Sequence, residues 1–200
     1  MFSFLSCQNY DSDKYIKTEN KAINDIILEI TQFEKMENLN EWKNKKLKLY
    51  IVSKLDTNTN EIIKPTGYDI SSNGVEYTKE RIEKNKKAFE ENLADYKIEN
   101  FLFSVLKKGK IKARTLNYNF TNEKLKIELI EKNDFGKDHT KENDFGYLNI
   151  SRVIFNKRFT KGYLSFSFIC LDGCGWGENI EIKKINGKWK LNKSFSGWII

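Results

Sequence analysis

The last third of the chain constrains the fold more than any other part, because it repeats one short pattern four times. Apolar and polar side chains alternate with a period of two in the segments 147–155, 162–170, 178–185 and 188–195. Such alternation is typical of strands that bury one face. Asn186-Gly187, between the last two segments, predicts a type I′ turn and therefore a hairpin. These residues predict an antiparallel meander of four strands.

Two segments nearer the N-terminus have the spacing of amphipathic helices. Between residues 18 and 36, apolar side chains recur every three or four positions, which predicts a helix with Thr18 as its N-cap. The same spacing predicts a second helix from Thr78 to about Tyr96. Residues 46–55 alternate instead, which predicts a strand with one face in solvent.

A chain of 200 residues with 39% hydrophobic content can bury one sizeable core. Two further strands are expected at 116–120 and 124–130. We therefore expect one α+β domain over residues 18–200, in which N-terminal helices pack on a C-terminal antiparallel sheet. Residues 8–17 are polar, and we expect them to form a tether.

The formal net charge of +7 does not by itself predict a nucleic-acid partner. Of the 35 basic residues, 31 are lysines, and most of them are interleaved with glutamates. The basic runs at 43–48 and 107–112 contain none of the arginines and aromatic rings that contact bases. We expect a solvated, lysine-rich surface and no nucleic-acid binding.

The first residues place a cysteine after a short apolar segment. Phe4-Leu5-Ser6-Cys7 is followed by polar residues, and it resembles the end of a bacterial lipoprotein signal. The resemblance implies that Cys7 receives a lipid and becomes the mature N-terminus. Only six residues precede Cys7 and none is basic, whereas an export signal needs a basic segment and about 7–15 apolar residues. We expect residues 1–17 to be a signal remnant and tether; the alternative is an apolar tail packed on a cytoplasmic domain.

A second resemblance lies in the last third. Its residues are Ser151-Arg152-Val153, a strand ending in Cys170, Cys174-Gly175, and Asn186-Gly187-Lys188-Trp189. Together they resemble the C-terminal half of an uncharacterised family of bacterial secreted or lipid-anchored proteins. Ile154 replaces a glycine of that family, and Leu171-Asp172-Gly173 slightly changes the cysteine spacing. The resemblance implies export and an α+β fold, and it implies no reaction.

The segment CLDGCGWGEN, which begins at Cys170, combines two cysteines with three glycines. A zinc site needs four ligands, and the only histidine, His139, lies 31 residues upstream of Cys170. A redox motif or a phosphate loop needs a helix after the motif, whereas a strand is expected here. We therefore expect a turn that a disulfide between Cys170 and Cys174 closes in an oxidising compartment.

These observations predict a cell-envelope lipoprotein that binds a protein or another envelope ligand, with no catalytic residues, cofactor or metal. The expected contact surface is the sheet face and the cysteine loop, with Trp176, Gly175 and Gly177 as candidate binding residues. Trp176 is either an exposed contact, so that Trp176→Ala spares folding and weakens capture, or a core residue. Arg152 is expected to tie a strand edge or a loop carboxylate. The alternatives are a small envelope enzyme that uses the cysteine loop and a cytoplasmic immunity-type protein.

Overall fold

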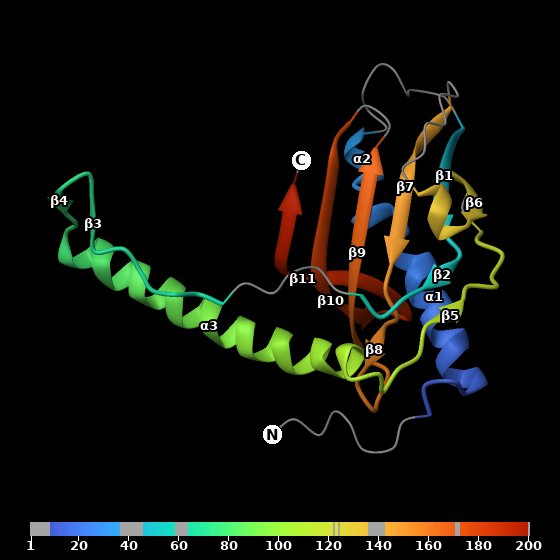
Figure 1. The fold of residues 1–200 in the computed structure, drawn as a ribbon, viewed down its shortest axis with the longest axis horizontal. Coiled ribbons are helices and arrows are strands. Elements are labelled where there is room, and N and C mark those ends of the chain that lie inside the picture. Colours follow the sequence, from blue (N-terminus) through green and yellow to red (C-terminus); the bar gives the residue numbers. More distant parts are fainter. Residues whose placement is uncertain are drawn as a thin grey trace.

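The computed structural model describes residues 9–36, 46–58, 64–121, 123, 125–135, 143–170 and 173–199. Its centre is a seven-stranded mixed sheet with the order β11-β10-β9-β7-β1-β6, in which β8 also pairs with β9 (Figure 1). The α+β class is therefore confirmed. The predicted meander is present: β7 (Asp144–Ile150), β9 (Lys161–Cys170), β10 (Gly175–Ile185) and β11 (Lys188–Ile199) pair antiparallel in chain order.

Local sequence determines two details of this meander. Asn186 and Gly187 have φ angles of 49° and 81°, as a type I′ turn requires, so β10 and β11 form the predicted hairpin. The segment 147–155, expected as one strand, is divided into two. β7 ends at Ile150, and the short β8 (Ile154–Phe155) begins after a break that contains Arg152.

The sheet is mixed because its other half is parallel, which corrects the expectation of an antiparallel sheet. β1 (Leu47–Val52) pairs in parallel with β7 on one side and with β6 (Leu125–Ile130) on the other. Parallel strands are usually covered by other parts of the protein on both faces of the sheet. Accordingly Tyr50, expected on a solvent-exposed face, is 3% exposed and stacks on Tyr147.

The remaining short elements connect the larger ones. They are α2 (Phe33–Met36), β2 (Lys54–Leu55), β5 (Arg114–Thr115), which pairs with β2, and the 3-10 helix η1 (Lys132–Asp134). The strand expected at 116–120 is wrong, because the chain there forms no ladder and β6 remains an edge strand of the sheet.

One face of the sheet is covered by α1 (Asp13–Ile30). Its apolar stripe, Ala22, Ile23, Ile26, Ile27 and Ile30, is buried against the apolar residues of that face. The helix begins earlier than Thr18: Ser12 is the N-cap, and its hydroxyl accepts a hydrogen bond from the backbone N–H of Tyr15. Thr18 lies inside the helix and donates to the carbonyl oxygen of Lys14. Part of the expected tether is therefore folded, and Tyr15 is buried.

Carboxylates of α1 also satisfy the edge of β11. Asp25 accepts a hydrogen bond from the backbone N–H of Trp189 at 3.0 Å, and Glu29 accepts one from that of Leu191 at 2.6 Å. Unpaired N–H groups on an edge strand invite pairing with another chain. These two contacts block that pairing along the first half of β11.

The second long helix, α3 (Lys79–Lys107), is mostly an arm. It begins where predicted, with Thr78 as its N-cap, but it continues well beyond Tyr96. Its last two turns contribute Leu102, Phe103 and Leu106 to a small core with Ile154 and Tyr163, on the sheet face opposite α1. The first part extends away from the sheet and bears at its far end the hairpin of β3 (Ser71–Ser72) and β4 (Val75–Glu76) (Figure 1). The prediction that both helices pack on the sheet is therefore confirmed for the whole of α1, but only for the last turns of α3.

Candidate functional site

The two loop cysteines lie at disulfide distance, which fits the predicted disulfide bond. Cys170 ends β9 and Cys174 directly precedes β10, with their Cα atoms 5.2 Å apart. The backbone N–H of Cys170 donates to the carbonyl oxygen of Cys174 at 2.8 Å, and Gly173 has a φ of 82°. The pair therefore closes the connection between two strands that are already hydrogen-bonded.

Trp176 belongs to the core, so its proposed role as an exposed contact is wrong. Its side chain is 9% exposed and packs against Phe168, with ring centroids 4.8 Å apart. Its Nε1 donates a hydrogen bond to the carbonyl oxygen of Ile30, at the end of α1. Trp176→Ala would therefore leave a large cavity in the core and would not spare folding.

Gly175 and Gly177 point to the other face of β10, where a tryptophan covers them. A Cβ atom on Gly177 would lie 2.5 Å from Nε1 of Trp198, and one on Gly175 would lie 3.3 Å from the same ring. These glycines leave room for the indole ring, which is a structural reason for glycine at both positions; their assignment as ligand-binding residues stays a prediction.

The sheet face opposite α1 carries small polar side chains at its centre. In β9, Leu164, Phe166 and Phe168 belong to the core under α1, so Ser165 and Ser167 between them face the opposite way. Asn179 of β10 pairs with Ser165 in the strand register. The set continues through Asn149 and Ser151 on one side and Ser196 of β11 on the other. We call Asn149, Ser151, Ser165, Ser167, Asn179 and Ser196 the polar band.

A pocket of about 160 Å³ lies at the first end of the polar band. Asp56 and Asn58 line it together with Asn149 and Ser167. The carboxylate of Asp56 accepts hydrogen bonds from the Lys132 ammonium at 3.1 Å and from the Asn58 amide at 2.9 Å. The Oδ1 atom of Asn149 is fully buried, and no described residue donates a hydrogen bond to it. Among the described residues, Asn24, Asp144 and Trp189 also have one buried side-chain atom without a partner, but of these four residues only Asn149 lines this pocket.

A larger cleft of about 320 Å³ lies at the second end, between α3 and β11. Glu99 of α3 lines it and is only 3% exposed. Its Oε1 accepts hydrogen bonds from the Asn179 amide at 2.7 Å and the Ser196 hydroxyl at 2.6 Å. The polar band therefore joins the two cavities.

A tyrosine and a glutamate lie beside the polar band. The Tyr163 hydroxyl donates to Glu181 at 2.7 Å, and Lys161 pairs with the same carboxylate at 3.1 Å. Burial, and then the nearby Glu181 carboxylate, raise the pKa of Tyr163 well above its usual value. The phenol therefore stays protonated and remains a hydrogen-bond donor at neutral pH.

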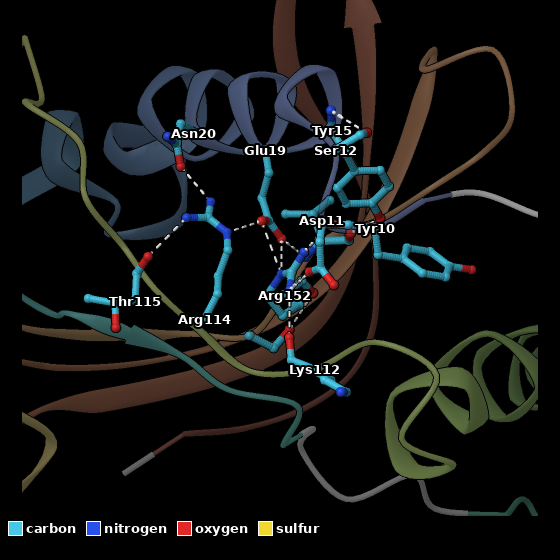
Figure 2. Close-up of polar contacts among 12 residues, drawn as sticks. Tyr10, Asp11, Ser12, Tyr15, Glu19, Asn20, Lys112, Arg114, Thr115 and Arg152 are labelled. Atoms are coloured by element: carbon cyan, nitrogen blue, oxygen red, sulfur yellow. Dashed lines mark hydrogen bonds and ion pairs between the residues drawn. The ribbon is translucent and has the colours of Figure 1, made fainter.

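A second polar cluster lies between α1 and the segment that joins β7 to β8 (Figure 2). Arg152 is fully buried, and its Nε donates to both oxygens of Glu19, at 2.9 Å and 3.0 Å. Its other nitrogens donate to the carbonyl oxygens of Lys112 and Tyr10. Glu19, also fully buried, accepts further hydrogen bonds from Arg114 at 2.6 Å and from the backbone N–H of Val153 at 2.7 Å.

This cluster is structural, because its partners are internal: Glu19 pairs with both guanidinium groups, and Asp11 lies 3.8 Å from Arg152 as a second carboxylate. Arg152 ties a carboxylate, as the sequence predicted, but the carboxylate belongs to α1 rather than to a loop or strand edge. The contacts to Lys112 and Arg114 add the segment after α3 to the same cluster.

Two candidate residues, Cys7 and His139, lie outside the described residues. In the part of the chain that the structure describes, no three His, Cys, Asp or Glu side chains are grouped so as to hold a metal ion. Of the helices among those same residues, none has the length and apolar content to cross a membrane.

Comparison with protein-family models, curated proteins and solved structures gave no match to this chain. The resemblance of residues 144–198 to a secreted bacterial family therefore stays a prediction.

The polar band was not predicted, although part of it has a local signal in the sequence. Serines alternate with large apolar residues in the run Leu164-Ser165-Phe166-Ser167-Phe168. One face of β9 is therefore apolar, and the other is small and polar. The contributions of Glu99 and Asp56 come from distant segments and leave no local pattern.

Proposed function

We propose that the protein is a non-enzymatic binding protein of the bacterial cell envelope, anchored through a lipid on Cys7, that holds a polar ligand on its polar band. The observation that carries the binding proposal is the buried Oδ1 of Asn149, which lacks a donor and borders a pocket. A buried acceptor without a partner costs about 1–3 kcal/mol, and a ligand donor would offset that cost.

The make-up of the polar band supports this role. Hydroxyl and amide groups supply both donors and acceptors, and four members of the polar band, Asn149, Ser151, Ser165 and Ser167, line the smaller pocket. Ser165 and Asn179 lie on long paired strands, which hold their positions more precisely than loops would. Hydrogen-bonding groups held in this way favour selective capture of a polar molecule.

The cysteine pair supports an envelope location. Disulfides persist in oxidising compartments and are rare in the cytosol, and Cys170 and Cys174 lie at disulfide distance. This agrees with the expectation that Cys7 is a lipidation site.

A thermal-shift screen of the full chain against sugars, amino acids, amines and phosphates tests the binding proposal. Asn149→Leu is the deciding variant, because it removes the unsatisfied acceptor while keeping a similar volume. We expect it to retain or increase the melting temperature of the ligand-free protein and to lose the shift that a bound compound produces.

Asn117→Leu is the matched control, since Asn117 is exposed and far from the polar band along the chain. We expect it to keep the ligand-induced shift. The proposal fails if no compound stabilises the protein, or if Asn149→Leu responds to every compound as the unmodified chain does.

A further inference from the structure

The cleft between α3 and β11 combines an acidic group with apolar walls. Pro65, Tyr96 and Phe195 supply the walls, and Asp95 and Glu99 supply carboxylates from successive turns of α3. Its volume of about 320 Å³ is roughly that of ten water molecules, at about 30 Å³ each. A small organic molecule fits a space of this size.

Glu99 is a buried side chain without a cationic partner among the described residues. Only 3% of Glu99 is exposed. The two groups that donate hydrogen bonds to its carboxylate, the Asn179 amide and the Ser196 hydroxyl, are both neutral. Among the described residues, no lysine, arginine or histidine forms an ion pair with it. Buried charged groups are normally paired, so the absence of a counter-ion for Glu99 among the described residues is unusual.

The neighbouring carboxylate does not have this deficit. Asp95 pairs with the Lys193 ammonium at 2.6 Å, so these two charges cancel. Of the two carboxylate side chains that line the cleft, only Asp95 therefore has a cationic partner among the described residues.

The aromatic walls are suited to the same kind of ligand. Ring faces attract cations within about 6 Å of the centroid. The ring of Phe195 has a cation at this range within the protein, because the Nζ of Lys193 lies 5.5 Å from its centroid. Tyr96 is a second ring on the cleft surface.

We propose that this cleft binds the alkylammonium group of a small organic cation, with Glu99 as its counter-ion and Tyr96 and Phe195 as its walls. This proposal rests on the proposed function, because it names the ligand class for one end of the polar band. Ser196, which lines the cleft and donates a hydrogen bond to Glu99, would also meet the polar part of such a ligand.

Isothermal titration of the full chain with choline, and with its neutral isostere 3,3-dimethylbutan-1-ol, tests the charge requirement directly. The two probes share a shape and differ in charge, so we expect choline to bind at least about tenfold more tightly, which corresponds to about 1.4 kcal/mol. Glu99→Gln keeps an oxygen for Asn179 and Ser196 and should reduce choline affinity at least about tenfold. Glu90→Gln, at an exposed position of the same helix, should leave it unchanged.

Tyr96→Leu provides a second variant that keeps the charge and removes a ring, and we expect it to weaken choline binding several-fold. The proposal is overturned if choline does not bind, if both probes bind equally, or if Glu99→Gln retains full affinity. Should it fail while Asn149→Leu still removes the response to screened compounds, the ligand class is wrong and the binding face stands. Loss of both results would remove the proposed function as well.

Discussion

The buried cluster around Glu19 offers the sharpest test of how the domain is held together. Glu19→Ala would leave the guanidinium of Arg152 fully buried without its carboxylate, and would remove the acceptor for Arg114 and for the N–H of Val153. Removing one partner of a buried ion pair costs about 3–5 kcal/mol. Since domains of this kind are stable by about 5–15 kcal/mol, that loss is a large share of the total.

Urea denaturation followed by circular dichroism measures this loss. With an m-value of about 1–3 kcal/mol per molar, the midpoint should fall by at least about 1 M urea. Lys21→Ala, in the exposed ion pair with Asp25 on the same helix, is the control and should change stability by less than about 1 kcal/mol.

A double variant separates the effect of the unpaired charge from that of lost packing. Glu19→Leu combined with Arg152→Met no longer leaves the buried guanidinium unpaired, but Arg114 and the N–H of Val153 still lose their acceptor. The double variant should therefore recover part of the stability lost in Glu19→Ala. The reasoning is refuted if Glu19→Ala costs less than about 1 kcal/mol, or if the double variant is no more stable than the single one.

Four further outcomes are expected. Gly177→Ala should lower the melting temperature because its Cβ would meet Trp198 and backbone, whereas Gly67→Ala, in open space, should be nearly neutral in the same thermal melts. Trp176→Ala should cost about 3–5 kcal/mol in urea denaturation, as for other buried aromatic residues. Burial raises the pKa of Tyr15, whereas an unfolded tyrosine ionises near pH 10, so the contribution of Tyr15 to the free energy of unfolding is constant below about pH 10, and the free energy of unfolding should fall above that pH in denaturation series at stepped pH. Intact mass of the native protein should show an acylated chain beginning at Cys7 and no alkylation of the Cys170–Cys174 pair without reductant; a chain beginning at Met1 with free thiols would contradict the envelope location.

Local sequence patterns predicted the elements whose stability is local. The period-two segments and the Asn186-Gly187 turn located the meander, because strand alternation and type I′ turns are properties of neighbouring residues. The start of the second helix at Thr78 was also predicted correctly. The start of α1 was missed because its first turn, from Asp13 to Lys17, is mostly polar, and the burial of Tyr15 depends on a distant contact with Val153.

Features that depend on long-range pairing were not predictable in the same way. The parallel position of β1 follows from its register with β6 and β7, which no local pattern encodes. The face on which Trp176 lies is set by the register of β10, since a shift of one residue would reverse it. The alternation Gly175-Trp176-Gly177 did contain the useful hint that the indole and the two glycines occupy opposite faces. The polar band needed several strands and α3 to be brought together.

Amide NMR of the labelled chain, titrated with a compound that stabilises it in the thermal screen, tests the central claim most directly. The account holds that the sheet face opposite α1 is the binding surface. It predicts the largest shift changes at Asn149, Ser165, Ser167 and Asn179, with little change in the apolar stripe of α1. Changes confined to the β3–β4 hairpin or to the α1 side of the sheet would contradict it.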